Sequence, residues 1–450
     1  MPEFDPNHRI ILSRAIASWF VRRDGKYYDI DNYTTKLALP DVQAICIERF
    51  ADEFAHIPLS KDLIRAAFKA SFNTLTTPAA ERVGTWSGSV LSAPGCSDRL
   101  LRHRGTVSIN TWTKPTYRSH GINAAEYGCA DEFFSWIFPR HHERTRALDW
   151  LAWNLQHESD KPGWCLFLYS DKKGTGKSKF ATLCEALFGK RNTAREYSAS
   201  KLTGRFNVPV LTSKLVIGEE IKLQTGSGTS NALKTYITED RVLGEMKGVD
   251  AQMIEQRCCF VFTSNHPPLW IEPDERRYYV LNIDHDGHAS GPRSNEFVQL
   301  MIQIDELLAD ETALARLYNA LMSRELSPDF NAKSLNITQH STDIMRQVQN
   351  AAQQVSTELL REHLDQAGCN CIAESELVSF VQQTLRGNIE TIRHKMTELG
   401  WHRHTLKWGG VDHNRVLWIR DGYSAYRGRL KAPDGTTSPI ASPLAEEARL

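Results

Sequence analysis

Residues 165–178 read Cys-Leu-Phe-Leu-Tyr-Ser-Asp-Lys-Lys-Gly-Thr-Gly-Lys-Ser, an apolar run followed by a loop rich in glycine and lysine. The apolar run predicts a buried strand, and residues 179–188 have the pattern of a helix. A strand, a glycine-rich loop and a helix in this order can cradle phosphate groups, because the loop amides and the helix N-terminus point at the same place. The segment therefore predicts a phosphate-binding loop.

The loop carries the groups that bind a nucleoside triphosphate with its metal ion. The predicted binding residues are Gly174, Thr175, Gly176, Lys177 and Ser178. Lys177 would reach the β- and γ-phosphates, and the Ser178 hydroxyl would bind Mg²⁺, so ATP and Mg²⁺ are the predicted cofactors. The pattern G-x-x-x-x-G-K-[ST] has glycine where this chain has Asp171. An accidental Gly-Lys-Ser turn is the alternative interpretation.

Three further apolar runs follow, at residues 214–218, 259–262 and 278–281, with helical stretches between them. Continuous apolar strands that alternate with helices are typical of a sheet buried on both faces. The fold class predicted for this part of the chain is therefore α/β, with a parallel sheet. Residues 131–157 predict two helices before this block, interrupted at Pro139.

Polar residues flank the later strands. Glu219 and Glu220 follow the run at 214–218, where one carboxylate would hold Mg²⁺ and the other would polarise water. Asn265 follows the next run and would hydrogen-bond the γ-phosphate or the attacking water. Arg276 or Arg277, before the last run, would stabilise transition-state charge from a neighbouring subunit. The alternative for the two glutamates is a solvated strand end, for Asn265 an Asn-His-Pro turn, and for the two arginines a surface ion pair.

In this order the motifs resemble the superfamily 3 helicases, particularly the helicase part of the primase-helicases of phages and mobile elements, near the virulence-associated E and poxvirus-like types. The resemblance spans about residues 131–284. It implies an AAA+-like P-loop ATPase core that assembles as a ring, commonly a hexamer, and moves along single-stranded DNA.

The resemblance also implies a role for each motif residue. The Walker A lysine and Mg²⁺ hydroxyl would be Lys177 and Ser178, the Walker B pair Glu219 and Glu220, the sensor Asn265, and the arginine finger Arg276 or Arg277. The family has a DNA-gripping hairpin with a basic tip between its second and third motifs. Lys247, beside Gly248, fits that tip, and a solvated loop lysine is the alternative.

The C-terminal region predicts a winged helix. Residues 374–383 and 388–399 form two expected helices, and residues 401–419 form two strands around a turn at 408–411. Residues 386–431 contain ten Lys/Arg and four Asp/Glu, a local excess that suits duplex or forked DNA. The predicted DNA-binding residues here are Arg393, Lys395, Arg403 and Lys407. Protein contacts or ring packing are the alternative roles.

Composition limits the classes of protein to which the chain can belong. The 450 residues have 54 Lys+Arg and 54 Asp+Glu, so nucleic-acid binding must come from local patches. Nine cysteines without paired C-x-x-C spacing indicate a reducing, intracellular compartment. We find neither a signal peptide nor an apolar run long enough to span a membrane, which predicts a cytoplasmic protein.

Four parts are expected along the chain. Residues 1–125 form an α+β region with one helical stretch near residues 59–71, and residues 126–345 form the ATPase domain. Residues 355–425 form the winged helix, and residues 432–450 a flexible tail. The polymerase half of a primase is not evident before residue 130, so we assign no primase activity.

Three functions are compatible with these features. The leading hypothesis is an ATP-dependent ring helicase that translocates on single-stranded DNA during replication of a phage or mobile element. Its expected partners are single-stranded and forked DNA, further copies of the chain, and a primase or replication initiator. The alternatives are a DNA-remodelling or defence ATPase without processive unwinding, and a replication initiator whose ATP site only controls assembly.

Overall fold

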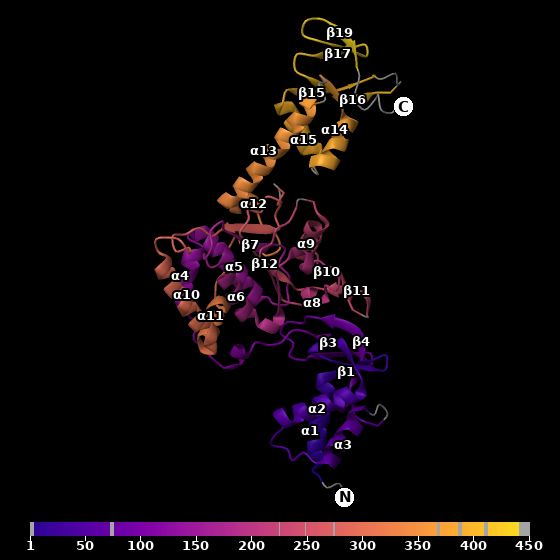
Figure 1. Cartoon of the computed structure of the whole chain (residues 1–450), viewed down its shortest axis with the longest axis vertical. Helices are drawn as coiled ribbons and strands as arrows, with labels where there is room; N and C mark the ends of the chain where they lie inside the picture. Colours follow the sequence, from indigo (N-terminus) through magenta and orange to yellow (C-terminus); the bar gives the residue numbers. More distant parts are fainter. Residues whose placement is uncertain are drawn as a thin grey trace. The chain divides into compact units, whose positions relative to one another are not determined.

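The computed structural model of the 450-residue chain describes residues 4–72, 76–224, 226–247, 249–272, 275–366, 370–385, 389–408 and 413–440. The chain divides into two units, Met1–Arg346 and Gln347–Leu450, which are described separately (Figure 1).

The centre of the first unit is a five-stranded sheet. Its strands are β7 (Cys165–Tyr169), β8 (Thr193–Glu196), β9 (Leu215–Gly218), β12 (Cys259–Ser264) and β13 (Tyr278–Asn282), in the spatial order β13-β7-β12-β9-β8. Every neighbouring pair is parallel, which confirms the predicted α/β class with a parallel sheet. All residues of β9 and β12 are buried, as expected for a parallel sheet covered on both faces.

Helices surround this sheet. They are α4 (Cys129–Ile137), α5 (His141–Gln156), α6 (Lys177–Phe188), α7 (Ala199–Leu202), α8 (Val208–Leu211), α9 (Gly228–Thr238), α10 (Ser294–Ala309), α11 (Glu311–Met322) and α12 (Ile337–His340). Helix α6 contacts β9 and β12, and α10 packs on both α4 and α6 (Figure 1). The predicted interruption at Pro139 is confirmed, because α4 ends just before it and α5 begins just after it.

The N-terminal part of this unit has a second sheet. Its strands are β1 (Phe20–Arg23), β2 (Lys26–Asp29), β3 (Asn32–Leu37), β4 (Gly84–Leu91), β5 (Leu100–His103) and β6 (Thr106–Asn110), in the order β3-β2-β1-β4-β6-β5. Three helices accompany it, α1 (Pro6–Trp19), α2 (Leu39–Glu53) and α3 (Lys61–Phe72). The expectation of a single helix was wrong, because only α3 was predicted. Proline stands in the first turn of both missed helices, where it favours initiation rather than breaking the helix.

The second unit contains helices and two small sheets. Its elements are the C-terminal part of α13 (Asp343–Gln366), β14 (Cys371–Ala373), α14 (Glu374–Phe380), α15 (Ile389–Glu398), β15 (Trp401–Leu406), β16 (Arg415–Arg420), β17 (Ser424–Tyr426), β18 (Arg429–Lys431) and β19 (Thr437–Pro439). One sheet has the order β14-β16-β15 and the other β17-β18-β19, and both are antiparallel.

The predicted tail from residue 432 begins too early, because β19 pairs with β18 and extends the ordered sheet to residue 439. Residues 441–450, and the turn residues 409–411, lie outside the described residues.

Two absences hold for the described part of the chain. No helix there is long and apolar enough to cross a membrane. The eight cysteines that the structure describes are all free thiols.

Candidate functional site

The loop after β7 has the backbone that its glycines predict. Gly174 and Gly176 have φ of 71° and 87°, the left-handed region that glycine enters without a steric penalty. Asp171 does not have a positive φ, so its backbone position does not require glycine. The departure from the sequence pattern therefore leaves the loop conformation intact. The twelve-residue α6 begins at Lys177, with its N-terminus facing the loop.

A neighbouring segment supports the loop from outside. The Ala289 amide donates to the Lys173 carbonyl at 3.0 Å, and a Cβ added at Gly174 would lie 2.9 Å from the Ala289 methyl. His285 Nε2 hydrogen-bonds the Thr175 carbonyl at 3.2 Å. Residues 285–289 thus hold the loop in place, a contact that the sequence motif does not reveal.

Lys177 is buried inside this loop. Its Nζ donates to Thr175 Oγ1 at 3.2 Å and to the Lys172 carbonyl at 3.4 Å. Burial lowers the pKa of the Lys177 ammonium, while the nearby Glu220 and Asp171 carboxylates act in the opposite direction. The cation is only weakly bonded within the protein, so an anion in the loop would be a better partner.

Ser178 and Glu219 lie together at the edge of the sheet. Ser178 Oγ donates to Glu219 Oε2 at 3.0 Å, and the Glu219 side chain is 10% exposed. A hydroxyl and a carboxylate side by side are hard oxygen donors of the kind that Mg²⁺ prefers. The two residues predicted to bind the metal ion are therefore adjacent.

Glu220 and Asn265 form a second polar pair at this edge. Asn265 Nδ2 donates to Glu220 Oε1 at 2.5 Å, and the two residues follow β12 and β9 respectively. Glu220 has φ of 53°, an unfavourable value for a residue with a side chain. Strain of this kind concentrates at functional sites, where the surrounding structure holds it. Here the Ile221 amide donates to the Thr263 carbonyl at 3.0 Å and fixes the turn.

Arg195, on β8, is a residue of the site that the sequence did not reveal. Its Nη2 lies 2.5 Å from Glu219 Oε1, and its Nη1 lies 2.8 Å from Glu185 Oε2. Burial alone would lower the pKa of Arg195, but the two carboxylates outweigh it and raise that pKa. Arg195 therefore fixes the Glu219 side chain from the side opposite Ser178.

We expect Arg195→Met to destabilise the protein by about 2 kcal/mol, because it leaves two poorly exposed carboxylates without their cation. Arg191→Met is the matched control, since Arg191 pairs with Asp31 and both side chains are well exposed, at 63% and 43%. The Arg191→Met substitution should lower the free energy of unfolding by less than about 1 kcal/mol. Denaturant unfolding of both variants checks this. Equal losses would mean that the Arg195 contacts have no special importance.

The two candidate arginines do not join this cluster. The Arg277 carbonyl accepts from the Cys165 amide, and Tyr278 pairs with Cys165 at the beginning of β7. The predicted phosphate loop follows the other end of β7, about 15 Å away along the five residues of this strand. Neither arginine could therefore reach a nucleotide held by its own chain without a large rearrangement.

Arg276 and Arg277 also differ from each other. Arg277 Nη1 lies 2.8 Å from Glu275 Oε1, and buried Glu275 also pairs with Lys234 at 3.4 Å. Arg276 is exposed, and it has no hydrogen bond or ion pair to any residue that the structure describes. Arg277 is thus committed to its own chain, whereas Arg276 is available to another molecule.

Lys247 lies at the exposed turn of a β-hairpin. The hairpin pairs β10 (Arg241–Met246) with β11 (Val249–Glu255) in antiparallel fashion, and Gly248 lies outside the described residues. Gln252 Nε2 donates to the Gly88 carbonyl at 3.1 Å, so the hairpin is attached to β4 of the N-terminal sheet.

The predicted basic residues of the second unit are largely engaged within it. Arg393 and Arg403 both pair with Glu374, at 2.7 and 3.1 Å. Burial opposes ionisation of Glu374, but the hydrogen bonds from Arg403 and Arg393 dominate and lower its pKa. Lys395 is buried, and desolvation lowers its pKa. Lys407, the last of the four predicted DNA-binding residues here, is exposed.

Comparisons with known proteins place this site in context. A family described only as a family of unknown function (DUF5906) matches residues 168–277, which include the predicted phosphate loop, Arg195, both glutamates and Asn265. A DNA primase-polymerase of Nitratiruptor phage NrS-1 is 27% identical over 142 residues, which cover 30% of this chain and 19% of that protein. The chain thus matches about a fifth of the curated relative.

Solved structures of the NrS-1 protein are also similar to this chain. The A form apo structure of the NrS-1 C-terminal region has a TM-score of 0.55 at 16% identity and covers 92% of this chain and 98% of that chain. Another A form apo structure of the same region has a TM-score of 0.52 and covers 92% and 99%. The similarity in fold therefore extends well beyond the segment of detectable sequence similarity. The chain resembles part of a phage replication protein.

Proposed function

We propose that this chain is an ATP-driven motor that acts on DNA during replication of a phage or mobile element. The observation that carries the proposal is the gathering of Lys177, Ser178, Glu219, Glu220 and Asn265 at the carboxyl edge of one parallel sheet. Strand β12 lies between β7 and β9, so Asn265 stands between the phosphate loop and the two acids. This arrangement supports an AAA+-like P-loop ATPase core.

The residues at this edge have distinct tasks in the proposed reaction. Loop amides and Lys177 would bind the β- and γ-phosphates of ATP. Mg²⁺, held through Ser178 and Glu219, would neutralise charge on the phosphates. Glu220 would orient and polarise the attacking water, with Asn265 fixing its carboxylate.

Contact with DNA is proposed through two features. Lys247 presents a cation on an exposed hairpin tip, where it would bind phosphates without reading sequence. In the second unit, the order α13-β14-α14-α15-β15-β16 supports a winged helix, in which α15 would be the recognition helix. The relative's description as a DNA primase-polymerase supports DNA as the partner.

In its helicase version, the proposal is that a ring of subunits moves along single-stranded DNA. In the family that the motifs resemble, this ring is commonly a hexamer. The exposed Arg276, which is distant from its own phosphate loop, supports assembly of sites between subunits. A DNA-remodelling ATPase, or an initiator gated by nucleotide, would use the same ATP site. Strand displacement on a forked duplex would distinguish the helicase from the remodelling ATPase and from the initiator. Stimulation of ATP turnover by single-stranded DNA would distinguish the helicase and the remodelling ATPase from the initiator.

Glu220→Gln provides the most direct test of the ATP site. We expect the variant to bind ATP normally but to hydrolyse it about 10²–10⁴-fold more slowly, because the amide cannot act as a base. The substitution preserves shape, and Gln can still accept the hydrogen bond from Asn265. ATP binding by a fluorescent analogue and phosphate release with single-stranded DNA are the measurements.

Glu53→Gln is the matched control, since Glu53 is exposed at the end of α2. It should leave turnover unchanged. Wild-type protein without DNA-stimulated ATP turnover would contradict the motor proposal. Full turnover in Glu220→Gln would instead contradict only the role of Glu220.

A further inference from the structure

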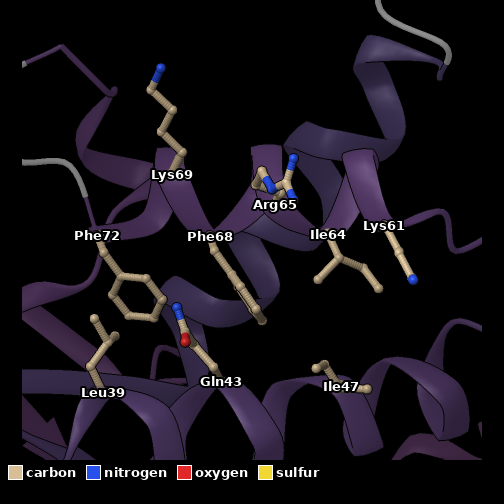
Figure 2. A pocket seen from close by; sticks show the side chains of 9 residues that line it. All are labelled: Leu39, Gln43, Ile47, Lys61, Ile64, Arg65, Phe68, Lys69 and Phe72. Atoms are coloured by element: carbon tan, nitrogen blue, oxygen red, sulfur yellow. The ribbon is translucent and has the colours of Figure 1, made fainter.

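Helices α2 and α3 of the N-terminal region border an open groove of about 580 Å³ (Figure 2). Leu39 and Ile47 of α2 line one wall, and Ile64, Phe68 and Phe72 of α3 line the other. Figure 2 shows side chains from the two helices pointing into the space between them. The groove belongs to neither the ATP site nor the proposed DNA contacts.

The apolar walls of the groove are regular. On α3, Ile64, Phe68 and Phe72 recur every four residues, and on α2, Leu39 and Ile47 lie eight residues apart. Residues four apart lie on the same face of a helix, so the α3 wall is a continuous apolar row, whereas the polar Gln43 lies between Leu39 and Ile47 on the α2 wall. Each wall runs for about 12 Å, a little over two helical turns.

The groove lies beside the core of the N-terminal region. Val42, Cys46 and Phe50 of α2 and Leu63 and Ala67 of α3 are buried in the N-terminal core. In contrast, Leu39 and Ile47 are 36% and 47% exposed. Phe68 and Phe72 of α3 are half-buried and pack against this same core. The groove therefore exposes one edge of the N-terminal core beside the more exposed Leu39 and Ile47 of α2.

The charge on the rim of the groove has one sign. Lys61, Arg65 and Lys69 of α3 line it, again at intervals of four residues, and no acidic residue is among its lining residues. Arg65 has a contact of 3.6 Å with Asp62, but both side chains are largely exposed, so this pair is weak. A ligand that matches the groove is therefore apolar on one face and negatively charged beside it.

We propose that this groove binds an acidic amphipathic helix of a partner protein. A helix laid between α2 and α3 would cover both walls with side chains at intervals of three and four residues. Acidic residues along its edge would meet Lys61, Arg65 and Lys69. Single-stranded nucleic acid fits less well, because the floor is aliphatic as well as aromatic and its cations lie along one edge only. This proposal does not depend on the ATPase proposal.

The test uses the full-length chain and two labelled synthetic helices. The first peptide carries leucines at intervals of three and four residues with glutamates beside them, and the second has lysine in place of every glutamate. Fluorescence anisotropy should show binding of the acidic peptide alone, weakened by added salt. Failure of the acidic peptide to bind, or equal binding of both peptides, would overturn the proposal.

Two charge-reversal variants locate the binding. The groove variant combines Lys61→Glu, Arg65→Glu and Lys69→Glu, and we expect it to bind the acidic peptide at least about tenfold more weakly. The control variant combines Lys26→Glu, Lys36→Glu and Lys190→Glu, exposed residues that do not line the groove. It carries the same change in net charge and should bind almost normally. Equal weakening in both variants would overturn the proposal, since it would show a non-specific effect of charge.

A third variant tests the apolar wall. Ile47→Asp changes an exposed residue, so the fold should survive, with the melting temperature as the check. We expect loss of peptide binding and unchanged ATP turnover, which separates failure of the groove from failure of the ATP site. If the groove variant lost affinity for a single-stranded oligonucleotide and kept its affinity for the acidic peptide, the partner would be nucleic acid and the proposal would be wrong.

Discussion

Lys177→Ala should reduce ATP turnover to background. Lys177 is buried in the loop, and its Nζ donates long hydrogen bonds to Thr175 Oγ1 at 3.2 Å and to the Lys172 carbonyl at 3.4 Å. Removing one preorganised donor to developing charge typically costs about 10²–10³ in rate, and this donor also carries a full charge. Phosphate release in the presence of single-stranded DNA measures the effect.

The same substitution should not weaken the fold. Because burial disfavours the charged form of Lys177, its removal takes an unfavourable charge out of a dry site. We therefore expect the melting temperature to stay the same or rise, which distinguishes lost chemistry from lost structure.

Lys190→Ala is the control for this variant. Lys190 is exposed just beyond the far end of α6, outside the phosphate loop. It should retain full turnover. An active Lys177→Ala protein would remove the basis for placing ATP in this loop.

The parallel sheet was predictable from the sequence because four of its five strands are nearly continuous apolar runs. Such strands must lie inside a sheet, and the carboxyl ends of parallel strands share one edge, so polar residues after them come close together. The contact between Asn265 and Glu220 follows from this rule, although the two residues are 45 positions apart.

Arg195 could not be found in the same way. All four residues of β8 are only partly buried, so the strand lacks the apolar run that revealed the others. Its partners, Glu185 and Glu219, lie on other elements and are brought to it only by the tertiary fold. Nothing in the local sequence distinguishes it from a surface arginine.

In the C-terminal basic region the fold adds a contact that a count of charges does not show. Counting charges between residues 386 and 431 gives a strong positive excess, but Glu374 lies just outside that window. In the fold it pairs with both Arg393 and Arg403. These three side chains meet only in the fold, so a count of charges within one sequence window does not show that Glu374 lies beside the two arginines.

Arg276→Ala is the second variant for which we expect a large effect. We propose Arg276 rather than Arg277 as the arginine finger, because Arg276 is exposed and Arg277 pairs with Glu275 of its own chain. We expect Arg276→Ala to bind ATP normally and to hydrolyse it about 10³–10⁵-fold more slowly, the usual effect of an arginine supplied to a transferring phosphate. Arg277→Ala should act differently, because Arg277 balances the buried carboxylate of Glu275. It should lower the melting temperature more than Arg276→Ala does.

Mixing two inactive proteins tests whether Arg276 acts on a neighbouring subunit. Lys177→Ala protein cannot turn over ATP but still offers Arg276, whereas Arg276→Ala protein retains an intact phosphate loop. Assemblies that contain both should therefore regain some active sites, since one subunit supplies the loop and the next supplies the arginine. Turnover of each protein alone and of the mixture, under conditions where subunits exchange, measures this recovery. If subunits exchange and turnover does not recover, Arg276 does not complete a site shared between subunits. The inactivity of Arg276→Ala would then need a cause within one chain, although the backbone places Arg276 about 15 Å from its own predicted phosphate loop.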